Sequence, residues 1–180
     1  MATLTPHTPA EIVIDELSSH DRAALAFSFR RLGEQSRYQR FQGIKRELTA
    51  RELDYLTAVD HWHHEALIAR STRPRAPIGV GRFVRGEEFD VAEIAVAVVD
   101  GWQRKGVGRA LMLALRDRAL ASGIHRFTAT MLGENRGALA LAYGLGPHRV
   151  ISRSAGVTQL EIDLRWGEDR WPLLRARGVS

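Results

Sequence analysis

Gln103-Arg104-Lys105-Gly106-Val107-Gly108 stands between an apolar strand-like run, Ile94 to Val99, and a long helix-like run, Arg109 to Ala121. This context predicts a turn that leads from a strand into a helix. The two glycines let the backbone turn sharply and approach a ligand closely. Because the first N–H groups of a helix have no intrahelical partner, they can point at phosphate oxygens. The stretch therefore predicts a phosphate cradle.

Two familiar glycine-rich loops do not match this stretch. A dinucleotide-binding fingerprint needs a third glycine where the chain has Leu111. A P-loop needs lysine and then serine or threonine after its last glycine, where Val107 and Gly108 stand. The order Gln/Arg-x-x-Gly-x-Gly/Ala after a strand instead resembles the acetyl-coenzyme A motif of the GNAT N-acetyltransferases.

The resemblance to this family extends beyond the motif. Ala92 to Trp102 is similar to the strand and turn before the family's loop, and Glu134 to Ala142 is similar to its next helix. Arg31 to Phe41 resembles one branch of the family, the acetyltransferase domain of bacterial protein-lysine acetyltransferases. The similarity runs from about Val13 to Leu164 and implies a single GNAT-like domain.

Hydrophobic periodicity and turn residues predict an α/β (α+β) fold. Three successive strands predict an antiparallel meander in the N-terminal part, and alternating helices and strands after it predict a mixed central sheet with flanking helices. We expect strands at 11–15, 66–69, 78–84, 91–99, 126–131, 149–152 and 158–164, and helices at 24–32, 36–41, 51–59, 108–121 and 135–145. The predicted domain spans 1–164, and a C-terminal tail without a strong period spans 165–180.

Length and composition indicate an ordinary enzyme domain. The chain has 180 residues, of which 44% are hydrophobic, so one domain with a substantial core is expected. It has no cysteine, which excludes disulfides, thiolate metal sites and a cysteine nucleophile. The N-terminus does not resemble a leader, and no run approaches the roughly 20 apolar residues of a membrane span. We therefore expect a cytoplasmic protein with no membrane partner.

The formal net charge of +5 and the pI near 10.4 raise the question of nucleic acid. The arginines are dispersed and no nucleic-acid-binding motif accompanies them, so no nucleic-acid partner is expected. Part of the excess charge can serve an anionic cofactor, and Arg104, Lys105 and Arg109 are placed for that role. Homodimerisation stays open.

Glu93 is the candidate general base. Forming an amide from a thioester needs a neutral amine, whereas a lysine-type amine has an ordinary pKa of about 10.4 and is mostly charged at neutral pH. Glu93 lies in a run of small and aliphatic residues, so we expect it to be partly desolvated, with its pKa raised toward neutral. The resemblance puts the family's usual base at this position. The alternative is a glutamate that faces water or pairs with an arginine such as Arg82.

The resemblance implies acetyl-coenzyme A as the co-substrate and implies which residues hold it. Its pantetheine would pair with the backbone of the strand before the loop, at Val98 and Val99. Asn135 is expected to face the cofactor, and a helix cap is the alternative role for this residue. The pyrophosphate would bind at Gln103, Arg104, Lys105, Gly106, Val107, Gly108 and Arg109.

The general acid stays unassigned. Many GNAT enzymes have Asn-x-x-Ala-x-x-Leu-Tyr, whose tyrosine protonates the leaving thiolate. Here Ala142 stands at the tyrosine position and Tyr143 follows it. A shift of one residue rotates a helical side chain by about 100°, so Tyr143 should point elsewhere. Water is the remaining candidate, because a thiolate is a tolerable leaving group.

The stretch His61-x-His63-His64-Glu65 raises a metal-site hypothesis. Its first and last residues would share a helical face at i and i+4, but no third ligand is indicated, so no metal is expected. The competing hypothesis is that one histidine borders the acceptor pocket or shuttles a proton. Arg37 and Tyr38 are further candidates for lining that pocket, and the alternative is that Tyr38 packs on a helix face.

We expect an acyl-coenzyme A-dependent N-acetyltransferase that transfers acetyl directly to a primary amine. The N-terminal resemblance favours a protein lysine as acceptor, whereas a polyamine, an aminoglycoside or an amino acid stays open because pocket shape decides among them. Two alternatives belong to other classes. One is a non-catalytic acyl-coenzyme A-binding sensor or partner module, and the other is a nucleic-acid binder, which rests on the pI alone.

Overall fold

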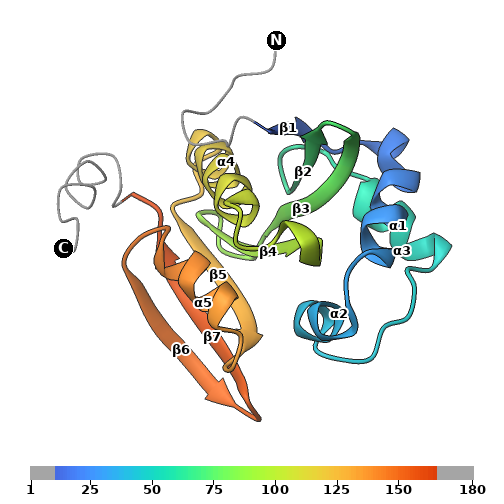
Figure 1. Ribbon diagram of the computed structural model, residues 1–180. Helices are drawn as coiled ribbons and strands as arrows, with labels where there is room; N and C mark the ends of the chain where they lie inside the picture. The colour runs from blue at the N-terminus through green and yellow to red at the C-terminus, as the bar shows by residue number, and fades with distance from the viewer. Residues whose placement is uncertain (1–10, 166–180) are drawn as a thin grey trace, which may run out of the picture.

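The computed structural model describes residues 11–165 as a seven-stranded mixed sheet with helices on both faces (Figure 1). Neighbouring strands follow the order β1-β2-β3-β4-β5-β7-β6, and every pair is antiparallel except β4 and β5. The predicted meander and mixed sheet are confirmed. The strands are β1 (Ile12–Glu16), β2 (His64–Thr72), β3 (Arg75–Arg85), β4 (Val91–Val98), β5 (Arg126–Leu132), β6 (His148–Ser154) and β7 (Val157–Asp163).

Five α-helices occur in the described part of the chain, close to the segments that the periodicity predicts. They are α1 (Arg22–Arg30), α2 (Glu34–Phe41), α3 (Ala50–Thr57), α4 (Val107–Ala121) and α5 (Arg136–Tyr143). Thr49 caps α3 as expected: its hydroxyl accepts the Glu52 N–H at 3.2 Å, and the Glu52 carboxylate accepts the Thr49 N–H at 2.8 Å. This reciprocal pair satisfies two donors that a helix start leaves unpaired. Except for Arg165, the predicted C-terminal tail lies outside the described residues.

Helix α4 packs closely on one face of the sheet because β3 carries glycines there. A Cβ at Gly79 would lie 3.2 Å from side-chain atoms of Val107 and Leu111, and one at Gly81 would lie 2.8 Å from Leu115. These three helical residues are at most 1% exposed and recur every four positions, so they form one buried face. Each fully buried side chain of this kind contributes roughly 1.5–3 kcal/mol. The main core therefore lies between α4 and the sheet.

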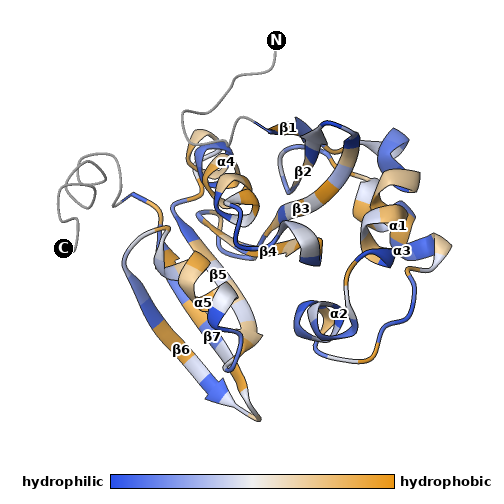
Figure 2. Cartoon of the chain, viewed as in Figure 1, coloured by the Kyte–Doolittle hydropathy of each residue, from blue (hydrophilic) through white to orange (hydrophobic). Residues whose placement is uncertain are grey.

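The opposite face of β2, β3 and β4 is covered by α1, α2 and α3. Side chains alternate across a strand, so Val80 and Arg82 point away from α4. Val80 packs against the small core of Leu17, Ala66 and Ile68. Figure 2 shows that α2 is largely hydrophilic. The strand pairing places Glu93 of β4 on the same face of the sheet as Arg82. This second face thus combines a thin apolar layer with charged groups.

Candidate active site

A cleft opens where β4 and β5 separate. The two strands pair only from Val91 to Glu93 and from Arg126 to Thr128, although β4 runs on to Val98 and β5 to Leu132. The remainder of β4 stays paired with β3 on its other edge. The space between the diverging strands has a volume of about 680 Å³ and is lined by β4, β5, α2, α5 and the turn before α4. This divergence creates an elongated groove in the middle of the sheet.

The cradle predicted at residues 103–108 lies at this groove. Arg104 and Gly106 have φ values of 60° and 84°, and Gly106 is the N-cap of α4. The left-handed conformation at position 106 is one that glycine adopts without strain. The N–H groups of the first turn of α4 have no intrahelical acceptor and lie at the positive end of the helix dipole. The turn can therefore bind an anion.

The cradle residues differ in where their side chains lie. Lys105 extends over the Trp102 ring, with Nζ 5.2 Å from its centre, and Val107 is buried against the sheet. Neither lines the groove. The cradle positions that do line it are Gln103, Arg104, Gly106, Gly108 and Arg109. Any contact that Lys105 or Val107 makes with a bound anion would thus have to come through its backbone or a rearranged side chain.

Gln103 holds the turn to neighbouring elements. Its side-chain amide donates to the Ser36 hydroxyl at 3.0 Å and to the Val98 carbonyl at 3.1 Å. One side chain therefore connects α2, the end of β4 and the cradle. Val98 also lines the groove.

Val99 departs from the expected backbone role. Its N–H donates to the Ile78 carbonyl at 2.9 Å, and its carbonyl accepts the Trp102 N–H at 2.8 Å. Its side chain is 3% exposed and does not line the groove. The chain turns away from the strand at this residue, so the Val99 N–H is already committed within the protein and cannot pair with a ligand as the resemblance implies.

Glu93 lies at the point where the strands separate. It is the last residue of β4 that pairs with β5, opposite Thr128, and it lines the groove. The expectation of partial desolvation is wrong, because the glutamate is exposed. The apolar neighbours that suggested burial, Ala92 and Ile94, point to the opposite, α4-covered face. Alternation along the strand places the carboxylate in the open groove.

Two arginines lie near Glu93 on the same side of the sheet. Arg82 is 7% exposed and its guanidinium stacks on the Tyr55 ring at 5.2 Å. Arg40, on α2, lines the groove and lies close enough to Arg82 and Glu93 to interact with both charges. Burial lowers the pKa of Arg40 and of Arg82 from the ordinary arginine value, and their mutual repulsion lowers the pKa of Arg40 further. Neither forms an ion pair with Glu93 among the described residues, so the alternative of a Glu93–Arg82 salt bridge is not observed.

Asn135 acts as a helix cap and also lines the groove. Its side-chain oxygen accepts the Ala138 N–H at 3.0 Å at the start of α5. Ala142 lines the groove, whereas Tyr143 stacks on His148 with ring centres 3.9 Å apart and does not. The predicted rotation of Tyr143 away from the site is confirmed.

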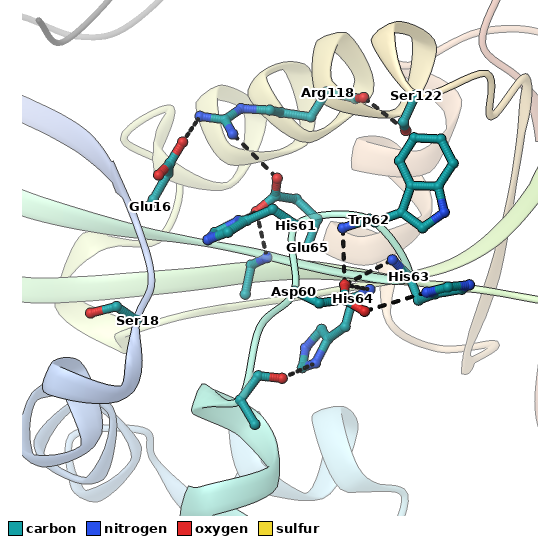
Figure 3. A network of polar contacts seen from close by, with 12 residues as sticks. Glu16, Ser18, Asp60, His61, Trp62, His63, His64, Glu65, Arg118 and Ser122 are labelled. Atoms are coloured by element: carbon teal, nitrogen blue, oxygen red, sulfur yellow. Dashed lines mark hydrogen bonds and ion pairs between the residues drawn. The ribbon is translucent and has the colours of Figure 1, made fainter.

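The histidine cluster forms a turn rather than a helix (Figure 3). One Asp60 oxygen accepts the N–H groups of residues 62, 63 and 64, at 2.8 to 2.9 Å. His61 contacts the buried Glu65 carboxylate at 2.8 Å, and the same carboxylate contacts Arg118 of α4 at 3.3 Å. Within residues 11–165 no three histidine, cysteine, aspartate or glutamate side chains are grouped to hold a metal ion.

The helices between residues 11 and 165 include none that is long and apolar enough to cross a membrane.

His64 is the one histidine of this cluster on the same sheet face as Glu93. It stacks on Tyr55, with ring centres 5.8 Å apart, and its Nδ1 lies 3.2 Å from the Ala58 carbonyl. Burial, and then the positive charge of Arg82, lower the pKa of His64. The ring does not line the groove, so its contact with the site runs through Arg82 and Tyr55.

The wall of the groove formed by α2 and the turn before it contains residues that the sequence analysis did not select. Arg37 and Tyr38 were expected there, but Arg37 donates to the Leu32 and Arg46 carbonyls and Tyr38 is 43% exposed outside the groove. The lining side chains of this segment recur at helical spacing, and that spacing is a signal that could have identified them. They are Leu32, Ser36, Gln39 and Arg40, and Gln42 at the end of α2 also lines the groove.

Comparisons with known proteins agree with this geometry. The model of the acetyltransferase (GNAT) family matches residues 34–146. The chain is 34% identical over 128 residues to the acetyltransferase Pat of Mycolicibacterium smegmatis, a match that covers 71% of this chain and 38% of that protein. This chain therefore spans well under half of that relative's length.

Solved structures give the same result. The GNAT domain of S. lividans PAT is similar with a TM-score of 0.77 at 26% identity, over 85% of this chain and 90% of that one. A cAMP-binding acyltransferase from Mycobacterium smegmatis is similar with a TM-score of 0.57 at 26% identity, over 92% of this chain and 48% of that one. The chain belongs to the GNAT family of acetyltransferases.

Proposed function

We propose that the protein transfers an acetyl group from acetyl-coenzyme A to a primary amine by direct attack. The observation that carries this proposal is a single groove with an anion-binding turn at the start of α4 and an exposed carboxylate, Glu93, where β4 and β5 part. The cradle suits a pyrophosphate because helix N–H groups and the basic side chains of Arg104 and Arg109 face one space. A solved structure of this fold, that of the putative acetyltransferase YncA from Salmonella typhimurium, contains its cofactor acetyl-CoA.

Glu93 is the proposed general base. The amine nitrogen attacks the thioester carbonyl carbon, the new C–N bond forms, the C–S bond breaks, and coenzyme A leaves as the thiolate. The charged acceptor nitrogen loses two protons in all: Glu93 accepts the first, directly or through one water, which frees the lone pair for attack, and the second passes to water when the C–S bond breaks. Its exposure lets it reach an amine that enters from solvent. No side chain is assigned to protonate the thiolate, since Tyr143 lies outside the groove.

Asn135, Val98 and the cradle would hold the acyl donor. Asn135 fixes the start of α5, which forms one wall of the groove, through its bond to Ala138. Val98 contributes to the β4 wall, and Gln103 fixes that strand end to α2. These contacts support a rigid groove, which orients the donor before the amine arrives.

We propose a protein lysine as the acceptor class. A lysine side chain on a protein surface can reach Glu93, because the carboxylate is exposed. Arg40 and Arg82 place two positive charges beside it, which disfavours polycationic acceptors such as polyamines and aminoglycosides. The 34% identity to Pat over most of this chain supports the same class.

The test follows free coenzyme A and labelled acetyl transfer with a panel of peptides, proteins and small amines. Glu93→Gln keeps the shape and removes the base, so turnover should fall by roughly 10²–10⁴-fold near neutral pH while acetyl-coenzyme A affinity barely changes. Turnover in this variant should recover partly at high pH, as free amine becomes available. Glu87→Gln, in the exposed turn before β4, is the matched control and should keep full turnover.

Two results would contradict the proposal. A Glu93→Gln enzyme with nearly full turnover on its best acceptor would remove the base assignment. Tight binding of acetyl-coenzyme A without release of coenzyme A for any amine would favour the non-catalytic sensor or partner module.

A further inference from the structure

A second cavity adjoins the groove. It is smaller, about 60 Å³, and lies between α1, α2 and the sheet. The two spaces share Leu32, Arg40, Ala95 and Ala97. Apart from the Ser28 hydroxyl, which donates to the Ala24 carbonyl, its polar side chains are those of two arginines, Arg40 and Arg82. An otherwise apolar cavity thus contains two guanidinium groups.

Arg82 has no anionic partner in contact within the described part of the chain. It is 7% exposed, and its guanidinium contacts Tyr55, through the face of the ring and through a side-chain hydrogen bond. Its neighbours across the sheet, Ala66 on β2 and Ala95 on β4, are small and apolar. Arg40 likewise has a ring contact, with Phe41 at 5.1 Å, and no carboxylate oxygen within 4.0 Å among residues 11–165.

This arrangement is unfavourable without an anion. A buried charge is ordinarily paired with an opposite charge. The free energy of moving a charge out of water is larger than the stabilisation from a cation–π contact. Two guanidinium groups close enough to repel add to that cost. Glu93 acts on both charges, but it is exposed and lies beyond ion-pair distance of either. The two arginines therefore match a negative group that no described residue, 11–165, supplies in contact.

We propose that Arg40 and Arg82 form a carboxylate-binding subsite that recognises a carboxylate on the acceptor, close to the amine that is acetylated. This inference rests on the proposed function. A planar guanidinium binds a carboxylate through two parallel hydrogen bonds, and two guanidinium groups side by side suit one such anion. With the amine at Glu93 and the carboxylate at the arginines, the preferred acceptor is an amine with a nearby acidic group. Such groups occur in a lysine that is followed by aspartate and in a small amino acid.

The experiment compares matched acceptors that differ in one charge. In the first arm, two peptides carry the same lysine followed by aspartate or by asparagine; in the second, the small amine is γ-aminobutyrate or its amide. The measured quantity is the ratio of kcat/KM between the acid and the amide in each pair. The wild-type ratio should be about tenfold or more in at least one arm, because a hydrogen-bonded charge discriminates at that level. The arm that shows it identifies the source of the carboxylate.

Two variants test whether the arginines cause the preference. Arg40→Gln and Arg82→Gln should each bring the ratio to within about twofold of unity. Arg153→Gln, on the exposed strand β6, removes the same charge away from the site and should keep both the ratio and the turnover of the wild type. If the buried Arg82 variant does not fold, Arg40→Gln alone decides, since Arg40 is only half-buried on α2.

A binding measurement keeps this test separate from that of the proposed function. Glutarate is titrated by calorimetry into protein saturated with coenzyme A, so that the phosphate cradle is already filled. Binding to wild type that is lost in Arg40→Gln would support the subsite even if no amine is acetylated; no binding to wild type in that case would overturn it. With turnover, equal ratios in wild type and Arg40→Gln would overturn it. The subsite proposal would also be overturned if wild type, but not Arg40→Gln, preferred succinyl-coenzyme A to acetyl-coenzyme A with an uncharged acceptor. In that case the carboxylate that the arginines bind would belong to the acyl group.

Discussion

Replacing Gly108 by valine tests a close packing contact beside the groove. Gly108 is the second residue of α4, and a Cβ there would lie 3.0 Å from Leu141 Cδ1 and 3.6 Å from Val98 Cγ2. The first distance is too short for an unstrained contact, and valine adds two methyl groups beyond the Cβ. Because Leu141 and Val98 both line the groove, the new side chain must push them apart or fill the space between them.

Two magnitudes follow from this geometry. Overpacking of this kind costs about 1–3 kcal/mol, and for a chain of this size each kcal/mol lowers Tm by roughly 2–4 °C. We therefore expect Tm to fall by roughly 2–12 °C. Acetyl-coenzyme A should bind at least about tenfold more weakly, which corresponds to about 1.4 kcal/mol, because the groove is narrowed beside the cradle.

A double variant separates packing from ligand approach. Adding Leu141→Ala removes the nearest atom, so the stability loss of the pair should be smaller than the sum of the two single losses, by about 0.5 kcal/mol or more. Affinity should stay low, because the valine still occupies the groove. Gly101→Val is the matched control, since a Cβ there meets nothing within 4 Å.

Thermal melts and calorimetry with acetyl-coenzyme A measure both quantities. An unchanged Kd in Gly108→Val would show that the acyl donor does not bind along this side of the cradle. Stability losses that simply add in the double variant would show that Leu141 is not the contact that the valine strains.

Three further predictions concern the surroundings of the site. Tyr143→Phe should keep kcat within about twofold, because the ring stacks on His148 outside the groove; a tenfold loss would restore the tyrosine as the general acid. Activity should survive EDTA, since the proposed chemistry needs no Lewis acid, and a loss that zinc reverses would point to the His61–Glu65 turn. His64 has a lowered pKa in the folded protein, so the unfolded chain takes up its proton first as pH falls. The free energy of unfolding should therefore not depend on His64 above about pH 6.5, and it should decrease as the pH falls below that value. Replacing His64 by phenylalanine should flatten that decline in urea titrations, whereas His63→Phe, at an exposed ring, should not.

Local features of this protein could be predicted because they depend on residues a few positions apart. Thr49 and Glu52 bond to each other's backbone at the start of α3, as the capping pattern indicates. The glycine at position 106 adopts the left-handed conformation that the turn requires. The apolar runs appear as strands and helices close to their expected bounds, and the rotation of Tyr143 follows from helix geometry alone.

The site itself depends on pairings between distant segments, which local patterns do not encode. β4 and β5 part after only three residue pairs, and that divergence leaves Glu93 exposed although its sequence neighbours are apolar. Arg40 and Arg82 come from α2 and β3, 42 positions apart, and face one cavity only after the sheet forms. Strand register decides which face each side chain takes, and a shift of one residue would reverse it. The sequence by itself determined the elements and the glycine turn that begins α4, whereas the tertiary structure decided which charges share the groove, because burial and charge proximity are properties of packed segments.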